Sequence, residues 1–260
     1  MSLITMDKSQ ELAKPKRGRA MDFSNVYEDS KRADAYSKLE FPGTYYLAFR
    51  DLPTIFSKHV TGKVAMDFGC GSGRSTRFLQ KLGFHTVSVD ISEEMVAKAR
   101  EFDPEGDYRV IEEADFSQFE IGSFDLIFSA FPFDNIPTMG QKVMNLSGLR
   151  DLLKEEGRLV NLVSNPEIYT HEWASFSTKD FPKNRDAKSG DVVLIIQMDT
   201  ADKRPVEDIL WTHESYMETY QKSQLKVVDI YNPLGKNEEP YEWINETKIA
   251  PWLIHVLSRI

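Results

Sequence analysis

The stretch KVAMDFGCGSGRSTRFLQKLG, residues 63–83, decides the fold of this chain of 260 residues. Its first six residues are mostly apolar and predict a short buried strand. Three glycines then stand at alternate positions, Gly69, Gly71 and Gly73, before a helix that Gly83 ends. Because a turn this rich in glycine weakens a fold, its presence indicates that something approaches the backbone closely. The stretch therefore predicts a strand, a ligand-binding turn and a helix.

The alternation of strand and helix continues toward the C-terminus. Ser92 has the position of a helix cap, with two glutamates in the first turn after it, and the clearest later helix is predicted over residues 139–157. The predicted strands of this part are residues 63–68, a strand ending at 88–92, and residues 108–116, 124–130 and 157–164. Such an alternation specifies a parallel sheet that helices cover on both faces.

The alternation of strands and helices ends after residue 165. An irregular segment, residues 165–190, precedes two apolar runs that the polar turn TADKRP separates, which predicts an antiparallel hairpin. A helix and two terminal strands follow. The predicted fold is α/β, a Rossmann-like seven-stranded mostly parallel sheet with helices on both faces, an N-terminal helical lid and a β-hairpin insertion. We expect residues 1–20 to be a flexible tail and 21–260 one domain, with a helical cap over 21–60 and the insertion over 165–212.

Composition limits the classes of function. With 41% hydrophobic residues the chain can bury a substantial core, and its formal charge of −9 argues against a nucleic-acid-binding surface. The basic run KPKRGR at 14–19 is interpreted as a solvated arm. No apolar segment has the roughly 20 residues that a membrane span needs, and the start lacks the apolar segment of a signal peptide. A single cysteine suits a reducing compartment. We therefore expect a cytoplasmic monomer or homodimer without membrane contact.

The glycine turn lies where an open parallel sheet binds its ligands, outside the carboxyl end of the first strand. Asp90 ends the second strand and is placed to bond both hydroxyls of a ribose. The dinucleotide fingerprint G-x-G-x-x-G is not matched, because Arg74 stands where its third glycine belongs. A phosphate loop, G-x-x-x-x-G-K-[ST], is also absent from the sequence. These residues favour a nucleoside site of another kind.

The run DFGCGSG, residues 67–73, resembles the first motif of the class I S-adenosylmethionine-dependent methyltransferases. The resemblance spans roughly residues 60–164, with matching elements to the C-terminus, and it implies S-adenosyl-L-methionine as the cofactor. The cofactor-binding residues that we assign on this resemblance are Asp67, Gly69, Cys70, Gly71, Gly73, Asp90, Ile91, Ala114, Asp115, Phe116 and Ser129.

The resemblance also implies individual roles. Asp67 and the backbone of the turn would hold the methionine part, and Ile91 would lie against the adenine. Asp115 would bond the adenine amino group, with Phe116 at the ring edge. Ser129, at the end of the fourth strand, would lie near the sulfonium. Each has a structural alternative: Asp67 can merely cap the following turn, Asp115 can cap a short helix, and Ile91 can belong partly to the core.

The implied reaction is in-line displacement at an activated methyl group, so that alignment matters more than a catalytic triad, and none is seen. Five histidines are scattered singly, and we predict no metal site. The loop after the fourth strand, SAFPFDNIP, lacks the Asn/Asp-Pro-Pro-Tyr found in enzymes that methylate amino groups of nucleic-acid bases. Its aromatic character favours a small-molecule acceptor. Low-ranked catalytic candidates are His171 and Tyr45, and candidate substrate residues are Tyr27, Tyr36, Phe131 and Trp173.

Three hypotheses follow. The first is a small-molecule methyltransferase. The second is an NAD-type oxidoreductase on a Rossmann sheet, which Arg74 disfavours. The third is a cofactor-binding protein without chemistry that regulates a partner, and it stays open because a binding turn does not prove turnover.

Overall fold

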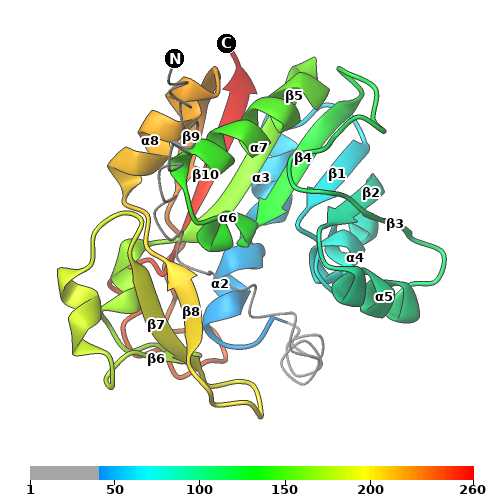
Figure 1. The fold of residues 1–260 in the computed structure, drawn as a ribbon. Coiled ribbons are helices and arrows are strands. Elements are labelled where there is room, and N and C mark those ends of the chain that lie inside the picture. Colours follow the sequence, from blue (N-terminus) through cyan, green and yellow to red (C-terminus); the bar gives the residue numbers. More distant parts are fainter. Residues whose placement is uncertain (1–40) are drawn as a thin grey trace, which may run out of the picture.

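The computed structural model describes residues 41–260, so that the predictions for the tail 1–20 and for Tyr27 and Tyr36 lie outside the described residues. One seven-stranded sheet runs through the molecule in the order β3-β2-β1-β4-β5-β10-β9 (Figure 1). β10 pairs antiparallel with both of its neighbours, while the other pairs are parallel. The mostly parallel Rossmann-like sheet predicted from the sequence is confirmed.

The strands of this sheet are β1 Val64–Phe68, β2 His85–Asp90, β3 Asp107–Val110, β4 Phe124–Ala130, β5 Leu153–Ser164, β9 Leu225–Tyr231 and β10 Trp252–Arg259. The helices of the described region are α2 Thr44–Arg50, α3 Leu52–His59, α4 Arg74–Lys81, α5 Glu93–Phe102, α6 Pro132–Asn135, α7 Met139–Leu152 and α8 His213–Lys222. Two 3₁₀ helices, η2 Pro166–Tyr169 and η3 Pro182–Asp186, lie in the segment after β5.

The central strands are apolar on both faces, and successive residues serve opposite cores. Ala65 packs in the cluster that contains α2 and α3, whereas Met66 packs in the cluster that contains α7 and α8. β4 repeats this alternation, with Phe128 on the first side and Ile127 on the second. Since strand side chains alternate with a period of two, a strand buried on both faces must be apolar throughout. This explains the continuous apolar runs of the sequence.

The segment between β5 and α8 forms a second, three-stranded sheet in the order β6-β7-β8 (Figure 1). Its strands are β6 Phe176–Ser177, β7 Val192–Gln197 and β8 Val206–Ile209. β7 and β8 pair antiparallel, which confirms the predicted hairpin. We refer to residues 165–212 as the insertion.

A buried carboxylate fastens the insertion to the N-terminal helix. One Glu246 oxygen accepts hydrogen bonds from the Thr44 hydroxyl and from the Ala174 backbone N–H, both at 2.7 Å. The other accepts from the N–H groups of Ile244 and Asn245. Since Glu246 is fully buried, these four donors are what compensates its desolvation. They set the position of α2 relative to the insertion.

Two predicted boundaries were wrong. The helix expected over 139–157 ends at Leu152, because Leu153 is already paired with Phe124 of β4. The strand expected over 108–116 ends at Val110. There the chain leaves the sheet edge and turns at Ala114, whose φ of +56° no strand adopts.

Candidate active site

The turn after β1 has the left-handed backbone that its glycines allow. Gly69, Gly71 and Gly73 have φ values of +71°, +52° and +80°. The N–H groups of Gly69 and Cys70 both donate to the Val89 carbonyl, at 2.8 and 3.0 Å, so that the turn folds over the end of β2. A side chain at any of the three glycine positions would be strained. The turn is thus held in a conformation that exposes its backbone.

Asp90, the last residue of β2, is bound to this turn. Its two oxygens accept from the Gly71 N–H at 2.8 Å and from the Ser92 N–H at 2.9 Å. Burial raises the pKa of the Asp90 carboxyl, and these backbone donors oppose the rise. Each carboxylate oxygen can accept a second hydrogen bond, so the group has capacity left for a ligand's hydroxyls.

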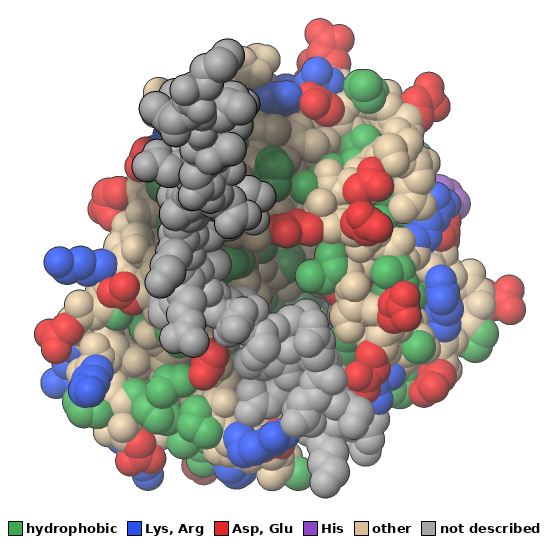
Figure 2. All heavy atoms as spheres, viewed as in Figure 1, with side chains coloured by type: hydrophobic (Ala, Val, Ile, Leu, Met, Phe, Trp, Pro, Cys, Tyr) green, Lys and Arg blue, Asp and Glu red, His purple; other side chains and the backbone are tan. Residues whose placement is uncertain are grey.

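A cavity of about 390 Å³ opens beside the turn and Asp90. Its lining residues come from the ends of β1, β2 and β4 and from the segments that follow β1, β2, β3 and β4: Phe68, Gly69, Gly71, Asp90, Ile91, Ser92, Met95, Ile111, Glu113, Ala130, Phe131, Pro132, Asn135, Ile136, Pro137, Gln141 and Asn145. Figure 2 shows this side of the molecule, where the surface is hollowed and hydrophobic side chains line the visible part of the hollow. We call it the cofactor cavity.

Four of the residues predicted to bind the cofactor line this cavity: Gly69, Gly71, Asp90 and Ile91. The exposed fraction of Ile91 is 55%, so it belongs to the cavity wall and not to the core. Sequence reasoning missed Met95, Ile111 and Glu113. In the wall after β4 it singled out Phe131, as a substrate residue, and missed the other lining residues. The motif SAFPFDNIP carried a signal for that wall, since an aromatic loop after a central strand has to cover a ligand or a core.

Three residues of the turn motif lie behind the cavity wall. Asp67 is fully buried, and one of its oxygens accepts from the hydroxyls of Ser75 and Thr76, each at 2.7 Å. Burial raises the pKa of Asp67 to about 6, against the opposing effect of these two donors. Cys70 is buried and its thiol pKa is raised by burial and by the nearby carboxylates, which suits a structural residue. Gly73 lies against the Tyr108 ring.

The segment predicted to contact adenine is divided in the structure. Glu113 lines the cavity, whereas the exposed Asp115 accepts a hydrogen bond from the Ser117 N–H at 2.9 Å. Phe116 is buried in the core against Phe68, with ring centroids 6.0 Å apart. Ala114 is half-buried between them. A role for residues 114–116 in adenine binding stays a prediction.

Two features beside the cavity bear on the binding of an S-adenosylmethionine-like ligand. A Cβ at Gly69 would lie 2.5 Å from Pro132 Cβ, so the turn and the loop after β4 approach as closely as glycine permits. Two buried oxygens near this point have no hydrogen-bond partner within residues 41–260, one on Asp67 and the Ser129 hydroxyl. Buried polar groups are normally satisfied, and unsatisfied ones call for an explanation such as a ligand or a water molecule. Ser129 itself is not a lining residue.

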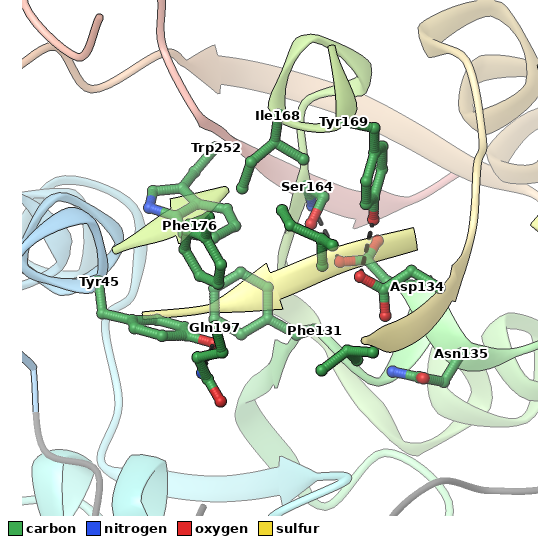
Figure 3. Close-up of a pocket in the computed structure, with 13 residues that line it drawn as sticks. Tyr45, Phe131, Asp134, Asn135, Ser164, Ile168, Tyr169, Phe176, Gln197 and Trp252 are labelled. Carbon is green, nitrogen blue, oxygen red and sulfur yellow. Dashed lines mark hydrogen bonds between the residues drawn. The ribbon is translucent and has the colours of Figure 1, made fainter. Parts of the chain in front are cut away.

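A second, smaller cavity of about 50 Å³ adjoins the first, and Phe131 and Asn135 line both. The lining residues are Tyr45, Phe131, Asp134, Asn135, Ser164, Ile168, Tyr169, Phe176, Ile195, Gln197, Val206, Asp208 and Trp252. Figure 3 shows aromatic rings on one side and the Asp134 carboxylate with the Tyr169 hydroxyl on the other. We call it the inner cavity. It brings together α2, the loop after β4, the insertion and β10.

The polar side of the inner cavity holds two carboxylates. Asp134 accepts from the Ser164 N–H at 3.0 Å and from the Tyr216 hydroxyl at 3.1 Å. Asp208 accepts from the Tyr169 hydroxyl at 3.2 Å. Burial, together with the nearby Asp134 charge, raises the pKa of Asp208 to about 7. Neither aspartate was among the residues singled out from the sequence, because 74 positions separate them and no motif joins them.

The other predicted acceptor residues divide between wall and core. Phe131 and Tyr45 line the inner cavity, and the Tyr45 hydroxyl accepts from the Gln197 amide at 2.7 Å. Trp173 is buried and its indole N–H donates to the Ile168 carbonyl at 2.8 Å, so it belongs to the core. His171 lies near Glu167, 3.3 Å from its carboxylate, and lines neither cavity.

None of the helices in residues 41–260 has the length and apolar character that a membrane span needs. No group of three or more His, Cys, Asp and Glu side chains is placed to hold a metal ion in the same part of the chain.

A glycine turn and a strand-end carboxylate at one cavity of a parallel sheet define a nucleoside-binding α/β domain. Residues 66–161 match the family model described as a methyltransferase domain. A ubiquinone biosynthesis O-methyltransferase from Paraburkholderia xenovorans is 23% identical over 183 residues, which cover 69% of this chain and 73% of that one. The family match covers the central part of the chain and indicates an S-adenosylmethionine-dependent methyltransferase.

Solved structures show the same fold. An S-adenosylmethionine-dependent methyltransferase from Mesorhizobium loti superposes with a TM-score of 0.58 at 18% identity, covering 82% of this chain and 98% of that one. One from Clostridium acetobutylicum gives a TM-score of 0.57 at 13% identity, covering 90% and 96%. Both likenesses concern the architecture of the chain. The family match disfavours the NAD-type oxidoreductase that the sequence had left as an alternative.

Proposed function

We propose that this methyltransferase transfers the methyl group to a small-molecule acceptor that binds in the inner cavity. The observation that carries the proposal is the shared wall: Phe131 and Asn135 line both cavities. A donor in one cavity and an acceptor in the other would therefore meet where the two cavities adjoin, beside Phe131 and Asn135. The inner cavity is too small for a folded macromolecular surface and is lined by buried residues.

Four lining residues would hold the cofactor. The backbone of Gly69 and Gly71 lines the cavity and would lie against the ligand, Asp90 would accept hydrogen bonds from its hydroxyls, and Ile91 would cover an apolar face. When bound, S-adenosylmethionine supplies a methyl group that is already activated by its positive sulfur. What the chain adds is alignment, which can contribute roughly 7–11 kcal/mol to lowering the barrier of such a step.

The walls of the inner cavity would exclude water. Tyr45 comes from α2, and Phe176 and Ile195 come from the insertion. We extend the proposal to these two segments as a cap over the acceptor, in keeping with the predicted lid. Glu246 accepts hydrogen bonds from both segments, and these bonds fix the position of the cap relative to the sheet.

Isothermal calorimetry tests the cofactor assignment. S-adenosylmethionine and S-adenosylhomocysteine should bind and NAD should not. Replacing Asp90 by Ala removes a charged acceptor worth about 1.5–3 kcal/mol, which weakens binding about 10- to 150-fold. Asp107→Ala, at the start of β3 and paired with Arg109 on the surface, is the matched control and should bind normally. Equal affinities in the two variants would remove Asp90 from the site.

A further inference from the structure

The inner cavity contains a carboxylate, Asp208, whose negative charge is compensated by few donors. Asp208 lines the cavity, and within residues 41–260 its one hydrogen-bond donor is the Tyr169 hydroxyl. Its charged neighbour across the cavity is another aspartate, Asp134, which repels it. Part of the Asp208 surface is accessible, and Asp208 lines the cavity, so a ligand there can reach it. A carboxylate in such a place favours a positive partner.

Asp134 differs because the protein already compensates it. It has two hydrogen-bond donors, and the buried Lys142 on α7 acts on it electrostatically. Lys142 donates to the Phe133 carbonyl and does not line the cavity. Lysine, arginine and histidine are all missing from the cavity lining in the described part of the chain. The positive charge that would balance Asp208 is therefore not supplied by the described wall.

Aromatic rings form the opposite side of the cavity. Trp252 lies 4.8 Å from Phe131 and 5.7 Å from Phe176, centroid to centroid. Tyr45 stacks on Trp252 at 5.7 Å and already has the Arg74 guanidinium over its ring at 4.9 Å, so the rings open to a ligand's cation are those of Phe131, Phe176 and Trp252. Faces of aromatic rings attract cations, most strongly where water is excluded. An aromatic wall facing a partly accessible, poorly compensated carboxylate is a combination that recognises an ammonium group.

We propose that the acceptor is an amine, whose nitrogen enters the inner cavity as an ammonium group between Asp208 and the aromatic wall. This inference rests on the proposed function and specifies the chemical class of its acceptor. A phenol or alcohol is the competing class. It would bring no positive charge, and a phenolate formed beside two carboxylates would be repelled.

Asp208 then also takes the proton. The bound ammonium gives one proton to the carboxylate, which frees the nitrogen lone pair. The amine nitrogen forms a bond to the methyl carbon while the carbon–sulfur bond breaks, and its electrons stay on sulfur. The products are the methylated ammonium and S-adenosylhomocysteine, and the proton leaves Asp208 for water when the product departs. A base whose pKa is about 7 can accept and release this proton near neutrality.

The test compares matched ligands on the full chain saturated with S-adenosylhomocysteine. Dissociation constants for benzylamine and benzyl alcohol are measured by ligand-observed NMR at pH 8. The amine should bind at least tenfold more tightly. Equal binding, tighter binding of the alcohol or no binding of the amine overturns the inference. Because S-adenosylhomocysteine binding is measured separately, failure of the cofactor assignment is recognised independently.

A neighbouring carboxylate provides the control for the variants. Asp208→Asn keeps the shape and removes the charge, and it should abolish the preference for the amine. Glu207→Gln changes the residue of β8 that precedes Asp208. Glu207 is exposed and outside the cavity lining, so this variant should keep the preference for the amine. If both variants behave alike, Asp208 does not recognise the amine.

The pH dependence needs no variant at this position. Asp208 must be ionised to bind the ammonium, so amine affinity should rise between pH 6 and 8, through the pKa of about 7, while alcohol affinity stays constant. The groups that face Asp208 are Asp134, which raises this pKa, and Tyr169, which lowers it by its hydrogen bond. Tyr169→Phe should therefore shift the midpoint to higher pH. A flat profile for the amine in the unaltered chain contradicts the inference.

Discussion

Replacing Gly69 by Ala tests how closely the glycine turn and the loop after β4 have to approach. The φ of +71° costs a residue with a Cβ about 1–2 kcal/mol. The new Cβ would also lie 2.5 Å from Pro132 Cβ and 2.7 Å from its Cγ, against a normal separation of roughly 3.5–4.0 Å. A proline ring cannot rotate away, so the overpacking adds about 1–3 kcal/mol. The expected loss of stability is about 2–5 kcal/mol.

Gly83→Ala is the matched control. Its φ is +81°, but a Cβ there would meet nothing within 4 Å, so that only the backbone term of about 1–2 kcal/mol applies. Thermal unfolding should separate the two, since each kcal/mol lowers the Tm of a chain this long by roughly 2–4 °C. Calorimetry with S-adenosylhomocysteine should show at least tenfold weaker binding for Gly69→Ala and none of this loss for Gly83→Ala.

The reasoning is refuted if the two variants lose the same stability and both keep the cofactor affinity. That result would mean that Pro132 moves without cost and that the contact between the two loops does not shape the cavity. Loss of affinity in Gly83→Ala alone would be equally damaging, because this residue lies at the far end of α4.

Two further perturbations test the framework around the site. Glu246→Gln places an amide group where N–H and O–H donors converge, so the free energy of unfolding measured in urea should fall by about 1–3 kcal/mol. An unchanged free energy of unfolding would mean that Thr44 and Ala174 are not held through this carboxylate. Burial lowers the pKa of His255 to about 3, below its ordinary value of 6.5, so between these values the unfolded state binds a proton that the folded state does not. The free energy of unfolding should therefore fall as the pH drops from about 6.5 toward 3, by up to roughly 1.4 kcal/mol per pH unit. His255→Gln should flatten this part of the profile, and an equally steep profile in the variant assigns the acid sensitivity to other groups.

Local patterns were enough to predict the sheet and one side of the site. A strand buried on both faces needs a continuous apolar run, and a turn at its carboxyl end with three left-handed residues needs glycines. Both requirements act over a few neighbouring residues, so residues 63–83 by themselves predict the strand and the turn. Asp90 followed because the second strand of a parallel sheet ends beside the first. The same local reasoning extended the helix over 139–157 too far, since pairing of Leu153 with β4 overrides helical preference.

Only the tertiary structure decided the inner cavity. Tyr45, Phe131, Asp134, Asp208 and Trp252 come from separate elements, and nothing in their spacing predicts that they share one wall. The same holds for charge: whether a carboxylate is compensated depends on which donors and cations the fold brings to it. Lys142 compensates the charge of Asp134 and not that of Asp208, although the sequence shows an aspartate at both positions. The sequence by itself determined the cofactor turn because that turn is built from consecutive residues, whereas the acceptor cavity is built from distant ones.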